Sequence, residues 1–188
     1  HWDSNATSAV IPEEVDELPV KEISSNAFQD CSNLIDIKIP NTVTYIGWDT
    51  FCNCSSLTNI IIPNSVTQIG VEAFYNCNNL TDIIIPDSVT RIGNSAFYKC
   101  SSLINVILPN TITEIEGATF AHCTSLKSVT IPNSVNSISY DAFYNCTSLT
   151  SVTIPNSVTS IGEFAFDGCT SLTNVTIPNS VTSIGDFA

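Results

Sequence analysis

The sequence has little positive charge and no long apolar segment. Lys and Arg number 5 against 18 Asp and Glu, which gives a formal net charge of −13 over 188 residues. Nucleic-acid binding needs a basic patch to neutralise phosphates, and docking on anionic lipid needs basic residues near the membrane. No apolar run approaches the roughly 20 residues that a bilayer span requires. We therefore expect no nucleic-acid partner and no direct membrane insertion in this segment, and we interpret the acidity as a source of solubility.

Residues suited to catalysis or cofactor binding are also scarce. The only histidines are His1 and His122, and the glycines do not form a phosphate-binding loop. His122 falls in a turn and is expected to be exposed. No set of nucleophile, base and orienting residue can be named. The acidic pairs Glu13-Glu14 and Asp16-Glu17 are interpreted as a solvated surface rather than as part of a calcium site. The sequence predicts no enzyme, no cofactor and no metal site.

What the sequence does contain is a unit that recurs every 23 residues. Three residue types keep this period in one register, which is the signature of a repeat protein whose units pack on their neighbours. Proline recurs at Pro40, Pro63, Pro86, Pro109, Pro132, Pro155 and Pro178. Phenylalanine recurs at Phe28, Phe51, Phe74, Phe97, Phe120, Phe143 and Phe166. Cysteine recurs at Cys31, Cys54, Cys77, Cys100, Cys123, Cys146 and Cys169.

The repeats divide the chain into a cap and an array. Residues 1–33 are expected to form an N-terminal capping repeat, acidic and carrying a five-residue insertion around Leu18-Pro19. A charged, divergent cap protects the core and strand edge that a bare solenoid end exposes. Residues 34–188 are expected to form one solenoid of six complete repeats and a truncated seventh. The start at His1 without a methionine and the stop inside a repeat lead us to expect a piece or processed form of a longer protein.

Each repeat predicts a short strand followed by a tight turn. In the repeat that begins at Leu149, Val152 and Ile154 alternate with outward residues in the period of two that a half-buried strand shows. Pro155 ends this strand because it has no N–H to donate. The Pro-Asn-Ser sequence that starts there suits a tight turn.

The second half of the repeat predicts another extended piece and a further turn. Val158 and Ile161 point inward, and Gly162 permits the next bend. Residues 165–169 form a helical or irregular turn with its apolar side toward the core. Two repeats depart from this pattern, because Glu116-Gly117 moves the glycine by one place and Ser139 replaces it. We expect local loop changes there and no loss of fold.

The full motif is Leu-Thr-Ser-Val-Thr-Ile-Pro-Asn-Ser-Val-Thr-Ser-Ile-Gly-x-x-Ala-Phe-x-x-Cys-Thr-Ser, over residues 149–171. It resembles the BspA-like (treponemal-type) leucine-rich repeat, and the likeness covers nearly the whole chain. The resemblance implies a repeat solenoid: a leucine-rich-repeat-like right-handed coil with short parallel β-strands and irregular or short helical turns. It also implies a secreted or cell-surface protein of a bacterium or protist that takes part in adhesion and has no catalytic residues.

The eight cysteines are predicted to be buried free thiols rather than disulfides or metal ligands. Seven occupy one repeat position, so their Cβ atoms should point inward in parallel, which disfavours disulfide geometry. A ladder with this period does not gather four ligands around one point. Cys52, two residues before Cys54, stands outside the row and is the one candidate for a reactive thiol.

The outward residues of the first strand are the predicted partner-binding surface, on the sheet that lines the concave face of a leucine-rich solenoid. Three consecutive isoleucines form an apolar stripe flanked by acids and amides, which suits protein binding. Filling of a half-covered sheet by residues of high β-propensity explains the stripe equally well. The candidate residues are Lys38, Ile61, Ile84, Ile107, Thr130 and Thr153 in one row, and Asp36, Asn59, Asp82 and Asn105 in the next.

Five N-glycosylation sequons occur, at Asn5, Asn53, Asn79, Asn145 and Asn174. A sequence so rich in Asn, Ser and Thr produces sequons by accident. Asn53 and Asn145 are expected on an exposed turn and are the favoured acceptors if the source is eukaryotic. A glycan on Asn174 would obstruct the sheet.

The leading functional hypothesis is a non-catalytic extracellular interaction or adhesion module. Its expected partner is a protein on a cell surface or in the extracellular matrix, bound through the sheet. The alternative is a structural subunit whose identical rows stack end to end into a filament or sheath. A third hypothesis, binding to ice through the threonine ladders, would require a flat face.

Overall fold

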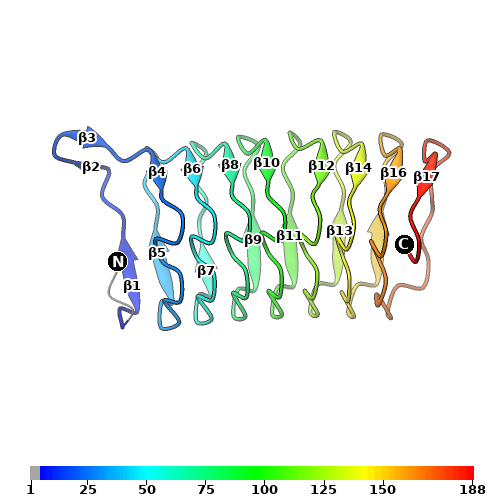
Figure 1. Cartoon of the computed structure of the whole chain (residues 1–188), viewed down its shortest axis with the longest axis horizontal. Helices are drawn as coiled ribbons and strands as arrows, with labels where there is room; N and C mark the ends of the chain where they lie inside the picture. Colours follow the sequence, from blue (N-terminus) through cyan, green and yellow to red (C-terminus); the bar gives the residue numbers. More distant parts are fainter. Residues whose placement is uncertain (1–4) are drawn as a thin grey trace.

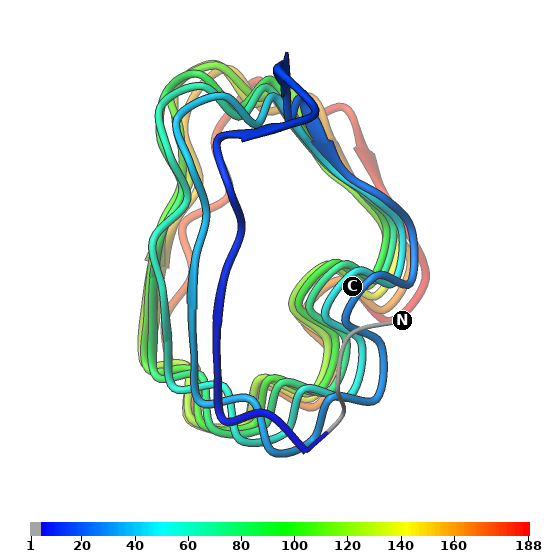
Figure 2. The same cartoon turned by 90° about the vertical axis from the view of Figure 1, so that its left-hand side faces the viewer.

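A computed structural model describes residues 5–188 and shows a solenoid of parallel coils stacked in a single row (Figure 1). Seen from the N-terminal end, the coils follow one outline (Figure 2). Each regular coil contributes two short strands, and the described residues contain no helix. The predicted parallel solenoid is confirmed, and its turns take the irregular form.

Two series of strands run along the stack. The first series pairs in the orders β1-β5-β7 and β9-β11-β13-β15, and the second in the orders β4-β6-β8-β10 and β12-β14-β16-β17. The first series is β1 (Ser8–Val10), β5 (Asp36–Lys38), β7 (Asn59–Ile60), β9 (Asp82–Ile84), β11 (Asn105–Ile107), β13 (Ser128–Thr130) and β15 (Ser151–Thr153). The second is β4 (Glu22–Ile23), β6 (Tyr45–Ile46), β8 (Gln68–Ile69), β10 (Arg91–Ile92), β12 (Glu114–Ile115), β14 (Ser137–Ile138), β16 (Ser160–Ile161) and β17 (Ser183–Ile184). All pairings in these two series are parallel, as in Ile37 with Ile60.

The core consists of rows of identical side chains, one from each coil. Leu57, Leu80 and Leu103 are fully buried, and the phenylalanine rings stack on one another. Centroid separations along the phenylalanine row run from 5.2 Å for Phe51 and Phe74 to 5.6 Å for Phe120 and Phe143. Because the coil spacing sets these distances, every core residue packs against its own equivalents above and below. Replacing one core side chain therefore changes the packing in its own coil and in the two neighbouring coils.

The turns contain two left-handed backbone positions in each repeat, and most of them are not glycine. Glu72, Ser95 and Ala118 have φ near +55°, and Lys99 has φ of 60°. Such conformations cost a residue with a Cβ about 1–2 kcal/mol. Hydrogen bonds between coils hold them in place, as in Ser95 N–H to Gly117 C=O at 2.9 Å. Contacts between coils therefore hold these residues in a left-handed conformation that is unfavourable for them in isolation.

The second strand series is interrupted between β10 and β12, at the repeat where the glycine is displaced. The ring of Tyr140 lies over Gly117, where a Cβ atom would come within 2.4 Å of the ring. The displaced glycine therefore makes room for this tyrosine. Across the interruption, Arg91 Nε donates to Glu116 Oε1 at 2.7 Å. As expected, the change is local and the coils continue on either side.

The insertion near the N-terminus folds into a hairpin that projects from the stack (Figure 1). Strands β2 (Glu14–Val15) and β3 (Leu18–Pro19) pair antiparallel. Asp16 and Glu17 have φ of 51° and 64°, as both central residues of a type I′ turn require. The coil that carries the hairpin joins the stack through β1 and β5 and through β4 and β6. The division at residue 33 stays a prediction.

Candidate interaction surface

The outward side chains of the first strand series form one surface, called here the first-strand face. Strand pairing sets Asp36 beside Asn59, and Ile84 beside Ile107. Every residue proposed from the sequence for partner binding is exposed on this face. Their part in binding stays a prediction.

The isoleucine row is the most exposed part of this face. The side chains of Ile61, Ile84 and Ile107 are 83%, 64% and 58% exposed, whereas the alternate residues Ile60 and Ile83 are buried. Large aliphatic side chains gathered on consecutive coils are uncommon on the surface of a soluble protein and mark interaction sites. Beyond β11 the row continues as Thr130 and Thr153.

A groove opens within the isoleucine row because β7 and β9 do not pair with each other. Its volume is about 550 Å³. One wall is the backbone and side chains of 59–62, and the other includes Asp82, Ile84 and Pro86. A second groove of about 330 Å³ lies between Ile107 and Thr130, where β11 and β13 share one pair, Asn105 with Ser128. By contrast, β13 and β15 pair over all three residues.

The polar row beside the isoleucines is organised by hydrogen bonds between coils. Asn105 Nδ2 donates to Asp82 Oδ1 at 2.7 Å. Together with a hydrogen bond from Thr81, this bond lowers the pKa of the Asp82 carboxyl below its ordinary value. In the turn row beyond the strand, Asp87 Oδ1 accepts from the backbone N–H of Asn110 at 2.7 Å. Two oriented carboxylates therefore lie beside the isoleucine row.

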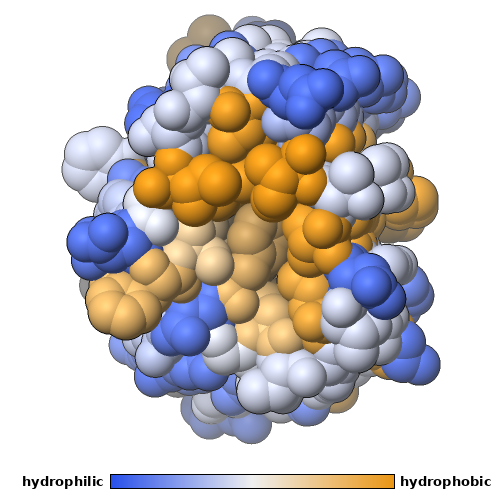
Figure 3. All heavy atoms as spheres, turned by 90° about the vertical axis from the view of Figure 1, so that its right-hand side faces the viewer, coloured by the Kyte–Doolittle hydropathy of each residue, from blue (hydrophilic) through white to orange (hydrophobic). Residues whose placement is uncertain are grey.

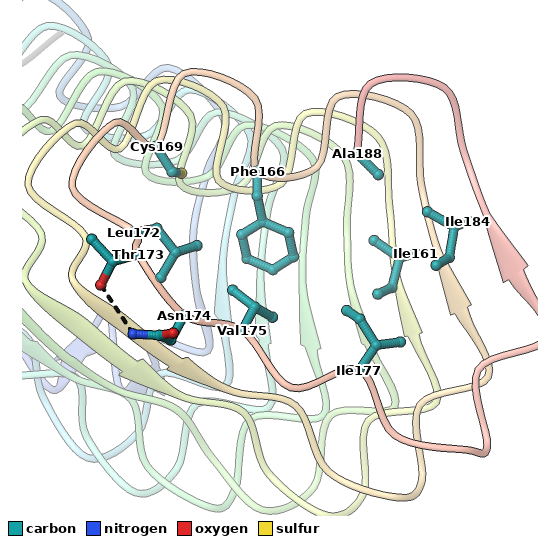
Figure 4. A pocket seen from close by; sticks show the side chains of 10 residues that line it. All are labelled: Ile161, Phe166, Cys169, Leu172, Thr173, Asn174, Val175, Ile177, Ile184 and Ala188. Atoms are coloured by element: carbon teal, nitrogen blue, oxygen red, sulfur yellow. Dashed lines mark hydrogen bonds between the residues drawn. The ribbon is translucent and has the colours of Figure 1, made fainter.

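A separate apolar hollow lies at the C-terminal end of the stack (Figure 3). Its volume is about 270 Å³, and Phe166 projects into its middle with Leu172 and Val175 beside it (Figure 4). Over its described residues, the truncated repeat has no first-series strand after β15, and Asn174 and Val175 lie in irregular backbone. Val175, Ile177, Ile184 and Phe187 are exposed at this end.

The cysteine row lies in the core, and each thiol after the first contacts a carbonyl oxygen. Cys100 Sγ lies 3.2 Å from Phe74 O, and the neighbouring coils repeat this contact. Burial raises the pKa of Cys100 to about 12. Cys52 was the expected reactive thiol, and that expectation is wrong: it is 5% exposed, and burial followed by the Asp49 and Glu72 carboxylates raises its pKa to about 11. A buried thiol near carboxylates forms little thiolate at neutral pH.

His122 is not simply exposed, as expected, but half-buried between two tyrosines. Its ring meets Tyr98 and Tyr144 edge-on, with centroid distances of 5.2 and 5.3 Å. Burial, and then the positive charge of Lys99, lowers the pKa of His122 below 6.5. The histidine fills a gap in a tyrosine row that Ala121 interrupts. No group of three or more His, Cys, Asp or Glu side chains within residues 5–188 is arranged to hold a metal ion.

The sequon asparagines lie in two environments. Asn5, Asn79 and Asn174 are exposed, whereas Asn53 and Asn145 are half-buried rather than exposed as expected. The Asn53 amide, to which a glycan would attach, donates to Asp30 Oδ1 at 2.8 Å. Glycosylation there would leave this nitrogen only one hydrogen to donate. Occupancy of all five sequons stays a prediction.

The sequence matches a family model described as BspA type leucine-rich repeat region (6 copies), over residues 21–150 and 136–188. No curated protein gives a significant match. In the part of the chain that the structure describes, no helix is long and apolar enough to cross a membrane.

Solved structures show the same architecture. A leucine-rich repeat protein from Bacteroides ovatus is 38% identical, with a TM-score of 0.88 over 95% of this chain and 45% of that one. The leucine-rich repeat protein of T. pallidum is 32% identical, with a TM-score of 0.85 over 90% of this chain and 79% of that one. A leucine rich cell surface protein from Faecalibacterium prausnitzii is 27% identical, with a TM-score of 0.63 over 95% of this chain and 59% of that one. The chain thus spans less than half of the Bacteroides protein.

Proposed function

Because this chain belongs to the BspA-type leucine-rich repeat family, we propose that it is a non-catalytic extracellular interaction module. It binds a protein on a cell surface or in the extracellular matrix through the first-strand face. The location draws support from the similar structure described as a leucine rich cell surface protein. The partner class draws support from the acidic surface, which disfavours nucleic acid and anionic lipid.

The observation that carries this proposal is the outward isoleucine row. Ile61, Ile84 and Ile107 are exposed although the core behind them is already complete. Burying such a side chain at an interface removes apolar surface from water and contributes about 1.5–3 kcal/mol. If these positions held isoleucine only because of its high β-propensity, there would be no reason for a groove beside Ile61 and Ile84.

The test is binding of the purified chain to an array of extracellular proteins, with two single substitutions at equivalent positions. Ile84→Asp places a charge in the isoleucine row, and Thr153→Asp places the same charge in the same row three coils away. We expect Ile84→Asp to weaken binding to the array partners by at least ~10-fold, and Thr153→Asp to leave it nearly unchanged. Both variants should unfold at the wild-type temperature. Equal binding by all three proteins would return the isoleucines to a purely structural role.

Stacking of copies into a filament is the second candidate, and a different observation favours it. The same parallel register recurs from coil to coil, as in Glu114 with Ser137 and Ser137 with Ser160, which is the repetition that a stack of copies requires. Sedimentation over a concentration series separates the two functions. One discrete species at every concentration supports the interaction module, whereas species that grow with concentration support assembly.

A further inference from the structure

The groove between β7 and β9 has features that define the chemistry of a partner segment. It runs alongside the two strands, and the isoleucines on its walls belong to neighbouring coils. Its volume of about 550 Å³ is that of a ligand site. The strands β7 and β9 nevertheless belong to neighbouring coils and remain in contact. A whole strand inserted between them would need about 9.6 Å, twice the normal strand spacing. The groove therefore suits a side chain that enters from an extended segment lying over the face.

The walls of the groove favour an aliphatic side chain. Ile61 and Ile84 are its most exposed apolar lining residues, and the buried Ile60 and Ile62 also line it. No Lys, Arg or His lines it. An aliphatic side chain seated between Ile61 and Ile84 would remove apolar surface of all three residues from water.

Two carboxylates set the charge beside the groove. Asp82 lines it, and Asp87 directly follows Pro86, which also lines it. Both are oriented by amide donors, Asn105 Nδ2 and Asn110 N–H, each at 2.7 Å. Neither has a Lys or Arg partner among residues 5–188, where the one ion pair is Arg91–Glu116. These negative charges are therefore free to meet a cation on a partner.

The spacing of the carboxylates fixes where those cations would lie. Asp82 precedes Ile84 by two residues, a distance of about 6.6 Å along a strand. In an extended segment, side chains on one face are also two residues apart. A basic residue two positions from the aliphatic residue would thus face Asp82. Asp87 lies three residues after Ile84, beyond the end of the strand and Pro86, so a second basic residue on the other side would lie farther along the segment.

We propose that the β7–β9 groove recognises an extended segment of a protein partner in which one aliphatic residue has Lys or Arg two positions away on the side of Asp82 and a further Lys or Arg on the other side. This assignment rests on the proposed function and names the chemistry of its partner. The aliphatic residue supplies most of the affinity, and the basic residues fix register and direction. General attraction of any cationic peptide to a chain of net charge −13 is the effect that a test must separate from this recognition.

The probe is a phage-displayed library of random twelve-residue peptides, selected on the wild-type chain at physiological salt. Parallel selections use Ile84→Asp, Asp82→Asn and the matched control Thr153→Asp. We expect peptides with an aliphatic residue, a basic residue two positions to one side and a further basic residue on the other side to be enriched on wild type and on Thr153→Asp, and to be lost on Ile84→Asp. On Asp82→Asn, the aliphatic residue should remain while one flanking basic position loses its preference.

Synthetic peptides then measure the two contributions by fluorescence anisotropy. Replacing the aliphatic residue of a selected peptide with Ser should weaken binding by at least ~10-fold. Replacing one basic residue with Gln should weaken it several-fold and reduce its dependence on salt.

Four outcomes overturn the proposal. These are selection of cationic peptides without the aliphatic position, retention of the same peptides by Ile84→Asp, no enrichment on wild type, and self-association of the wild-type chain that Ile84→Asp abolishes. The last would assign the groove to a second copy. A fifth outcome would overturn this assignment and leave the proposed function standing: array partners that bind through Ile84 but are not displaced by basic-aliphatic peptides.

Discussion

The first-strand face has two regions that share one scaffold and show different chemistry to solvent. From β7 to β11 the outward row is isoleucine, and a groove opens between β7 and β9. From β13 to β15 the row is threonine, and the strands pair over all three residues. Behind both regions the leucine and phenylalanine rows are buried alike. The inward positions thus specify the solenoid, while the outward positions are free to differ and are where a specific interaction would be encoded.

The largest expected effect comes from the core that the two regions share. Phe97→Ala, behind the isoleucine region, and Phe143→Ala, behind the threonine region, each remove a fully buried ring stacked on both sides. Each should lower the free energy of unfolding by about 3–5 kcal/mol. Urea unfolding followed by circular dichroism measures both. A much smaller loss for one variant would mean that the regions do not share an equivalent core.

The next effect should separate binding from stability. Exchanging Ile61, Ile84 and Ile107 together for Thr would make the first region resemble the second. Thr keeps β-propensity and the positions are exposed, so stability should change by no more than about 1 kcal/mol. Binding to a partner found on the array should fall by at least ~10-fold. The matched control is the double variant Thr130→Val and Thr153→Val, which should keep wild-type affinity. If the triple isoleucine variant lost as much stability as a core variant, the isoleucines would be structural.

A smaller effect is expected at Ala118, in the repeat that joins the two regions. Ala118 is held at φ of 54°, a left-handed conformation that glycine adopts without steric cost. Ala118→Gly should therefore raise the free energy of unfolding by about 0.5–1 kcal/mol. Asp141→Gly, at the same repeat position with φ of 53°, is the control. It should gain less, because Asp tolerates this conformation better than Ala does; equal gains would contradict this reason.

The smallest effect concerns His122 in the same repeat. Its pKa is lowered by burial and by Lys99, so the folded chain favours the neutral ring. As pH falls below 6.5, His122 of the unfolded chain binds a proton before His122 of the folded chain does. The free energy of unfolding therefore falls with pH until the folded histidine is also protonated. His122→Asn should remove this dependence while changing stability at pH 8 by no more than about 0.5 kcal/mol. Thermal unfolding from pH 5 to pH 8 measures it, and an unchanged pH profile would contradict the assignment to His122.

Much of the fold could be predicted because the same residue types recur at equivalent positions in every repeat. The rows of proline, phenylalanine and cysteine gave the period, and the alternation around Val152 and Ile154 gave the direction of the side chains. Because strands of equivalent position pair in such a stack, the placement of Ile84 next to Ile107 followed from the period alone. The residues of the exposed face could thus be predicted, but the grooves in it could not.

What could not be predicted depends on geometry between coils. The groove arises where β7 and β9 fail to pair, although their sequences fit the repeat. Left-handed turns at Glu72 and Ser95 carry no glycine signal, because hydrogen bonds from the next coil impose them. Cys52 looked separate in sequence but lies buried beside two carboxylates. Each of these features depends on contacts with a neighbouring coil that local sequence does not reveal.

Hydrogen–deuterium exchange of the chain with and without a protein partner found on the array would locate the surface that the partner covers. Bound partner should slow exchange of the backbone amides over 59–62 and 82–84, and leave those over 128–130 and 151–153 unchanged. Protection confined to the threonine region, or to the turns away from the first-strand face, would contradict the assignment of binding to the isoleucine row.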